Sequence, residues 1–76
     1  MSVRRKEFID DIKSQIADKR AEIKYFEQVN ERYRGYIEEE ESKEYINFYR
    51  NWIRGNNRRI EKLRTEIKEL KWLIAQ

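Results

Sequence analysis

Residues 46–74 read INFYRNWIRGNNRRIEKLRTEIKELKWLI, and this stretch decides the fold. Isoleucine recurs every seven residues, and a second series lies three residues after each isoleucine except the last. The first series is Ile46, Ile53, Ile60, Ile67 and Ile74, and the second is Tyr49, Asn56, Leu63 and Leu70. Alternating spacings of three and four, held over several heptads, are typical of a coiled-coil helix that buries one narrow seam. The stretch therefore predicts one long helix, with isoleucine at heptad position a and the second series at position d.

The first half of the chain carries the same pattern. Its a positions are Ile9, Ile16, Ile23, Asn30 and Ile37, and its d positions are Ile12, Lys19, Phe26 and Tyr33. Nine residues separate Ile37 from Ile46, so the heptad phase slips by two residues between the halves. One unbroken helix would swing its seam to another face there, whereas a turn keeps both seams facing each other. We expect an all-α, antiparallel two-helix coiled-coil hairpin forming one domain over residues 1–76, with helices at about 3–40 and 45–75 and a turn at about 41–44.

A three-helix bundle broken at Gly55 is the alternative fold. Gly55 followed by two asparagines resembles the end of one helix and the beginning of another. The seam nevertheless keeps its phase from Ile46 to Ile74, and a new helix beginning at Gly55 would have no reason to preserve it. The continuous helix is therefore favoured.

The register of the hairpin is set by two seam asparagines. In an antiparallel pair each a residue faces a d residue of the other helix, and the two residue numbers have a constant sum. If this sum is 86, Asn30 faces Asn56, and each amide finds a hydrogen-bonding partner. If it is 79, Asn30 faces Tyr49 and Asn56 faces Ile23. A buried amide without a partner costs about 1–3 kcal/mol, so the sum of 86 is favoured.

Six large apolar side chains in the half nearer the expected turn lie outside the seam, at heptad positions g and c. They are Tyr25, Val29, Tyr36, Tyr45, Phe48 and Trp52, which we call the aromatic flank. In an antiparallel pair the two g rows lie on the same side, so these residues should form a second apolar face. Exposed patches of this kind usually mark contact sites, and a chain of this size seldom buries enough apolar surface alone. We expect a homodimer in the form of a four-helix bundle, or docking on another protein.

Arginines follow one side of the second predicted helix. Arg50, Arg54 and Arg58 recur every four residues, and Arg59 adds to them. Such a ladder suits a phosphate backbone, so nucleic-acid binding is the alternative function. Charged rows on coiled coils are usually only solvated faces, and the net charge of +3 is modest.

Composition excludes most catalytic and metal sites. The chain has 76 residues and contains neither cysteine nor histidine, which removes thiolate chemistry, the commonest general base and the commonest metal ligands. A two-helix rod also lacks the concave site that catalysis or a small-molecule substrate needs. No apolar run approaches the length of a membrane span. We therefore expect a cytoplasmic, non-catalytic protein without cofactors, which acts as a small adaptor or inhibitor and has no membrane partner.

Overall fold

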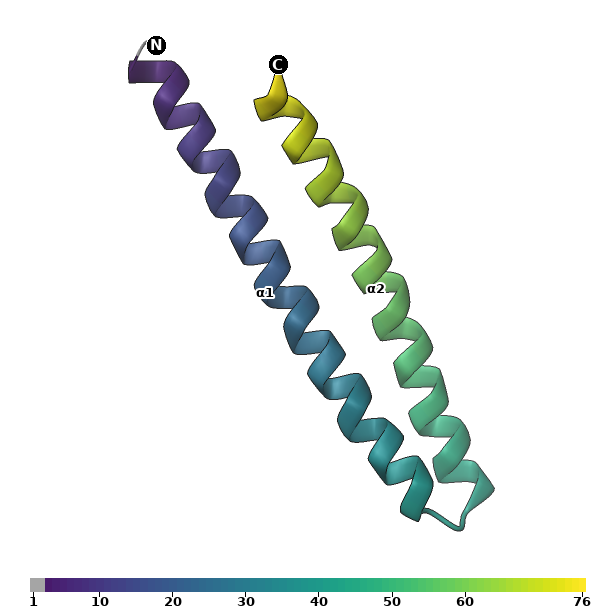
Figure 1. Ribbon diagram of the computed structural model, residues 1–76. Coiled ribbons are helices and arrows are strands. Elements are labelled where there is room, and N and C mark those ends of the chain that lie inside the picture. The colour runs from purple at the N-terminus through teal and green to yellow at the C-terminus, as the bar shows by residue number, and fades with distance from the viewer. Residues whose placement is uncertain (1–2) are drawn as a thin grey trace.

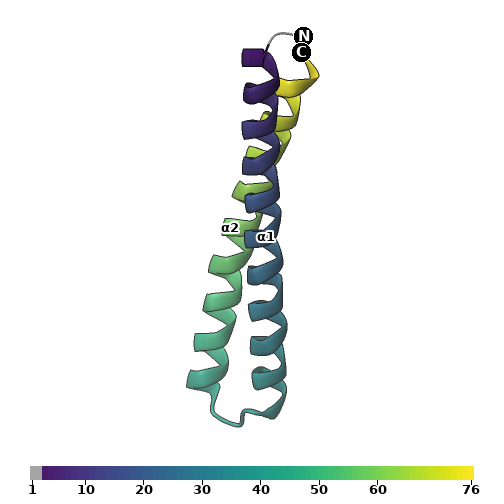
Figure 2. The same cartoon turned by 90° about the vertical axis from the view of Figure 1, so that its left-hand side faces the viewer.

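The fold is an all-α hairpin. A computed structural model describes residues 3–76, in which α1 spans Val3–Glu39 and α2 spans Lys43–Ala75. The helices lie side by side and antiparallel, with both chain ends at the end of the rod opposite the turn (Figure 1). A view from the side shows that the two helices stay together along their whole length (Figure 2). The hairpin measures 61 × 15 × 12 Å and is therefore a thin rod two helices wide.

Helix α2 passes through Gly55 without a break, so the three-helix alternative is not formed. Gly55 keeps an ordinary right-handed helical backbone, because no glycine among residues 3–76 has a positive φ. A glycine inside a helix costs about 1 kcal/mol relative to alanine. Seam residues on both sides of Gly55, namely Ile53, Asn56 and Ile60, pack against α1 and hold the helix together across this weak point.

The turn is short and contains no glycine. Helix α1 ends at Glu39 and α2 begins at Lys43, two residues earlier than the sequence pattern indicates. Ser42 occupies the N-cap position, as expected, but its side chain makes no capping hydrogen bond. The Ile46 amide donates to the Ser42 carbonyl at 3.0 Å, and the Ser42 amide donates to Oε1 of Glu40 at 3.1 Å. The Glu40 carboxylate thus closes the turn through the main chain.

The seam follows the heptads without exception, since every a and d position from Ile9 to Ile74 is buried or half-buried. The buried apolar residues are Ile12, Ile16, Ile60, Leu63 and Ile67. They all lie in the half of the rod that holds the chain ends. Between residues 17 and 59 only Asn30 and Asn56 are buried, and the apolar seam residues there are half-buried. The half of the hairpin nearer the turn therefore has no dry apolar core of its own.

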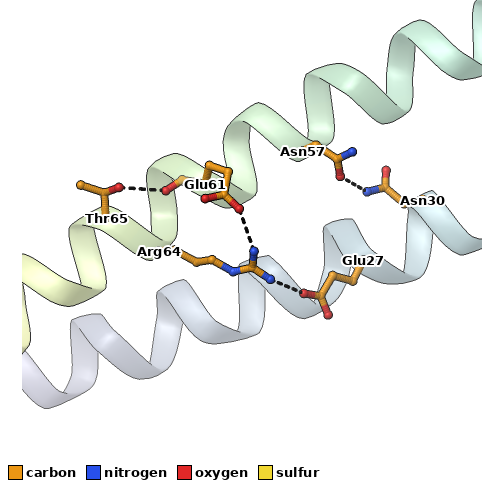
Figure 3. Close-up of polar contacts among 6 residues, drawn as sticks. All are labelled: Glu27, Asn30, Asn57, Glu61, Arg64 and Thr65. Carbon is orange, nitrogen blue, oxygen red and sulfur yellow. Dashed lines mark hydrogen bonds and ion pairs between the residues drawn. The ribbon is translucent and has the colours of Figure 1, made fainter.

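The two seam asparagines meet across the helices. Nδ2 of Asn56 donates to Oδ1 of Asn30 at 2.9 Å, and Nδ2 of Asn30 donates to Oδ1 of Asn57, also at 2.9 Å. The second of these bonds is drawn in Figure 3. Within residues 3–76 no buried side-chain nitrogen or oxygen lacks a hydrogen bond. The register in which paired numbers add up to 86 is confirmed, and the alternative that faces Asn30 with Tyr49 is not formed.

Replacing one asparagine of this pair by leucine should lower the free energy of unfolding more than replacing both. Asn30→Leu or Asn56→Leu should each lower the free energy of unfolding by about 1–3 kcal/mol, because the remaining amide stays buried without its partner. The double variant forms a leucine layer in the seam and should recover most of that loss. Urea unfolding followed by far-UV circular dichroism measures all four free energies. A double variant whose loss equals the sum of the single losses would contradict the pairing.

Candidate functional site

The aromatic flank combines one row of residues from each helix on the same side of the hairpin. A g–g ion pair fixes this arrangement, since Nη2 and Nε of Arg59 donate to Oε1 of Glu22 at 3.0 and 3.1 Å. Glu22 begins the row of α1 that continues through Tyr25, Val29 and Tyr36 at spacings of three, four and seven. Arg59 ends the corresponding row of α2. The two rows therefore lie beside each other, as the sequence predicts.

Five of the six flank residues are exposed to solvent. Their exposed fractions are 61% for Tyr25, 60% for Tyr45, 52% for Phe48, 51% for Trp52 and 42% for Tyr36, whereas Val29 is half-buried. Trp52 packs edge-on against Phe48 with ring centroids 6.3 Å apart, and Phe48 packs against the seam residue Tyr49 at 5.7 Å. Tyr36 reaches the same Tyr49 ring at 5.5 Å. The flank is thus continuous with the aromatic part of the seam and remains open on its outer side.

A shallow depression of about 460 Å³ lies on the α2 side of the flank. Its lining consists of Phe48, Asn51, Trp52, Gly55 and Asn56. A Cβ atom placed on Gly55 would meet nothing within 4 Å. No contact inside the hairpin therefore requires glycine at this position, although glycine weakens the helix. The sequence pattern indicated Gly55 on this face but did not identify Asn51, which occupies the outward f position.

Two ion pairs bound the flank on the side toward the chain ends. Beyond the pair of Glu22 with Arg59, Nζ of Lys19 lies 2.6 Å from Oε2 of Glu66. Lys19 is the one charged residue at a seam position among the a and d series, and its ammonium group leaves the seam to reach this carboxylate. The hydrogen bond from Lys19 lowers the pKa of the Glu66 carboxyl group below its ordinary value of 4.5. The apolar surface is therefore followed by a strip of paired charges.

The opposite side of the hairpin is polar. Arg64 bridges the two helices there, because its Nη2 lies 3.4 Å from Oε1 of Glu27 on α1 and its Nη1 lies 2.7 Å from Oε1 of Glu61 on α2 (Figure 3). Thr65 donates a hydrogen bond to the main-chain oxygen of Glu61 at 3.1 Å. We call this side the polar flank.

The four arginines proposed as a nucleic-acid ladder do not lie together. Arg50, Arg54 and Arg58 are exposed, and no ion pair involves them within residues 3–76. Arg59 instead lies on the side of the aromatic flank, where it is bound to Glu22. The sequence could have indicated that Arg59 lies apart from the other three arginines. Arg59 is at a g position, and the g residues of both helices lie on the side of the aromatic flank.

Trp72 is an exposed aromatic residue that the sequence pattern did not include in any face. It lies at an f position, is 63% exposed, and lines a second depression with Lys68, Glu69 and Leu73 near the end of α2. It is remote from the aromatic flank along the rod. This position makes Trp72 a matched control for Trp52.

No group of three or more carboxylate, cysteine or histidine side chains within residues 3–76 is placed to hold a metal ion. Neither α1 nor α2 contains a stretch that is long and apolar enough to cross a membrane.

Comparisons with protein-family models, with curated proteins and with solved structures found no match to the chain.

The Lys19–Glu66 pair should make stability depend on acid. Because the folded-state pKa of Glu66 is lowered, its contribution is present above the ordinary pKa of 4.5 and is lost as the pH falls through the lower folded value. Glu66→Gln should therefore lower the free energy of unfolding at pH 7. The difference in unfolding free energy between this variant and the wild type should become smaller at acid pH. Glu69→Gln changes an exposed carboxylate outside this pair and is the control. Unfolding free energies at several pH values test this, and a Glu66→Gln gap that stays constant with pH would contradict it.

Proposed function

We propose that this chain is a non-catalytic protein–protein interaction module, a small adaptor or inhibitor, that binds its partner through the aromatic flank. The observation that carries the proposal is the exposure of Tyr25, Tyr36, Tyr45, Phe48 and Trp52 on one side of the hairpin. Tyrosine and tryptophan are enriched among the residues that contribute most to binding energy. Contiguous exposed apolar patches of several hundred Å² are characteristic of interaction sites.

The uneven core supports the same role. The flank covers the part of the hairpin in which only Asn30 and Asn56 are buried. A partner seated on the flank would remove from water the half-buried seam residues as well as the exposed rings. Each Å² of apolar surface buried in this way is worth about 25 cal/mol before the cost of association. The exposed aromatic flank thus lies over the half of the hairpin that has no buried apolar core, which favours binding at the flank.

Two kinds of partner fit this role. A second copy of the chain would complete the four-helix bundle expected from the sequence, and a different protein could cover the same rings. In either case Phe48 and Trp52 should anchor the contact, because they border the depression above Gly55.

Substituting Trp52 should abolish binding, whereas substituting Trp72 should not. Tagged wild-type protein, Trp52→Ala and Trp72→Ala are each incubated with extract from the source cells, and the bound proteins, including untagged copies of the chain, are quantified by mass spectrometry. We expect the specifically bound protein to be lost at least about tenfold with Trp52→Ala and retained with Trp72→Ala, with little dependence on salt. Equal capture by all three proteins would contradict a role for the flank.

The alternative proposal is nucleic-acid binding, and one observation favours it. Arg50, Arg54 and Arg58 are exposed, repeat every four residues and have no ion-pair partner within the described residues. Unpaired arginines can contact successive phosphates without first losing an internal bond. Arg59 is no longer part of this proposal, since it is engaged with Glu22.

Charge reversal separates the two functions. Arg54→Glu with Arg58→Glu should eliminate the mobility shift of short single-stranded RNA or duplex DNA if the ladder binds phosphates. Wild-type binding should then weaken steeply between about 50 and about 200 mM salt. Arg4→Glu with Lys6→Glu makes the same change in net charge at the other end of the rod and is the control. Equal shifts for both double variants, or no shift for the wild type, would contradict nucleic-acid binding by the ladder.

A further inference from the structure

We infer that the polar flank carries a binding site for an anionic amphiphile, a molecule with one anionic group and an alkyl chain, in a depression near the chain ends where Lys13, Arg20 and Lys71 surround an apolar floor. The site lies on the side of the hairpin opposite the aromatic flank. The inference therefore goes beyond the proposed function and does not depend on it.

Cations dominate the two rows of e residues that border the seam on the polar flank. Within α1 and α2 these rows hold lysine or arginine at every position except Glu27 and Asn57. The basic members are Lys6, Lys13, Arg20 and Arg34 on α1 and Lys43, Arg50, Arg64 and Lys71 on α2. Among them only Arg64 forms an ion pair within residues 3–76. The e rows therefore carry positive charge that the hairpin leaves mostly unpaired.

Two of these cations stand where the neighbouring heptad has an ion pair. Nη2 of Arg64 lies 3.4 Å from Oε1 of Glu27 across the helices (Figure 3). One heptad closer to the chain ends, the corresponding residues are Lys71 and Arg20. Both are positively charged, so their repulsion opposes the packing of the helices at this place. An anion bound between them would be attracted by both.

A depression of about 400 Å³ lies at the same two residues. Its lining consists of Lys13, Ile16, Ala17, Arg20, Lys71 and Ile74. No carboxylate is among these residues. Ile16 is 5% exposed and belongs to the apolar core, and Ile74 is half-buried and packs against that core. The small side chain of Ala17 leaves this floor uncovered. The depression thus joins three cations from both helices to the wall of the hydrophobic core.

The cationic rim and the apolar floor together indicate the class of ligand. Guanidinium and ammonium groups bind carboxylate or phosphate oxygens through charge-assisted hydrogen bonds. The apolar floor stays in contact with water unless the ligand also has an apolar part. A fatty-acid carboxylate is the simplest molecule with both features. A nucleic acid or the surface of a bilayer offers anionic groups without a free alkyl chain, so either would use the rim and leave the floor wet.

Isothermal titration calorimetry with the purified chain tests this ligand class. Dodecanoate, below its micelle concentration, should bind at one site per chain. Butanoate has the same headgroup with a shorter chain, and dodecyltrimethylammonium has the same chain with a positive headgroup. Each should bind at least about tenfold more weakly than dodecanoate. No binding of dodecanoate, or equal binding of either comparison compound, would overturn the inference. Binding of single-stranded RNA or of phosphatidylglycerol vesicles in the absence of dodecanoate binding would overturn it as well.

Two alanines of α1 provide a matched pair of variants. Ala17→Glu places a carboxylate in the depression, whereas Ala21→Glu places one at an outward f position. Ala17→Glu should weaken dodecanoate binding at least about tenfold, because the new side chain fills the depression and pairs with its cations. For the same reason it should raise the melting temperature. Ala21→Glu makes the same change in net charge and should keep the binding of the wild type. Equal affinities of the two variants for dodecanoate would overturn the inference.

Removing two rim cations should separate binding from stability. Arg20→Gln with Lys71→Gln should weaken dodecanoate binding at least about tenfold and should not lower the melting temperature, because a repulsive contact is removed. Arg54→Gln with Arg58→Gln makes the same change in net charge nearer the turn and is the control. Wild-type affinity in the first double variant, or an equal loss in both, would overturn the inference.

Nuclear magnetic resonance locates the bound amphiphile on the chain. The amide signals that shift most on addition of dodecanoate should belong to residues 13–20 and 71–74. Shifts centred instead on Phe48 and Trp52 would place the amphiphile on the aromatic flank and would overturn the inference.

Discussion

The reciprocal contact between Asn30 and Asn56 is the constraint on which the rest of the hairpin depends. Hydrophobic seams tolerate a shift of one heptad, since isoleucine then still meets leucine or isoleucine, but a buried amide does not tolerate hydrocarbon. This pair selects one register, and Asn57 satisfies the remaining hydrogen-bonding group of Asn30. A shift of one heptad would put Trp52 where Arg59 now meets Glu22, so that a carboxylate would lose its partner and lie beside an aromatic ring. The polar pair thus determines which surface the hairpin presents.

The two halves of the rod differ in what they bury. Toward the chain ends, Leu63 and the isoleucines around it form a dry core, whereas toward the turn the only buried residues are the asparagines. Tyrosines replace aliphatic residues in the seam there, and their rings extend into the flank through Tyr49. The half with the buried core can keep the hairpin folded while the other half exposes a large apolar surface. Such an arrangement is suited to binding. A short chain without cysteine has no disulfide to compensate for the poorly buried half.

The two sides of the hairpin carry different chemistry because the register distributes the charges. On the aromatic side, Arg59 and Lys19 are paired with acids of the opposite helix, Glu22 and Glu66. On the polar flank, Arg64 is shared by two glutamates, while the arginines nearer the turn are left without ion pairs. Protein binding and nucleic-acid binding would therefore use different sides and need not exclude each other physically.

The sequence by itself determined the helices, the phase slip that makes the turn, the continuity through Gly55 and the pairing of the asparagines. These features follow from the heptad repeat, which has a period of 3.5 residues, and from the cost of one buried polar group, both of which can be read along the chain. Only the tertiary structure decided that Arg59 binds Glu22, that Lys19 binds Glu66, that Val29 is half-buried and that Asn51 lines a depression. Long side chains at g and d positions have several acids within reach, and the choice among them depends on the spacing and crossing of the two helices, which no single helix encodes.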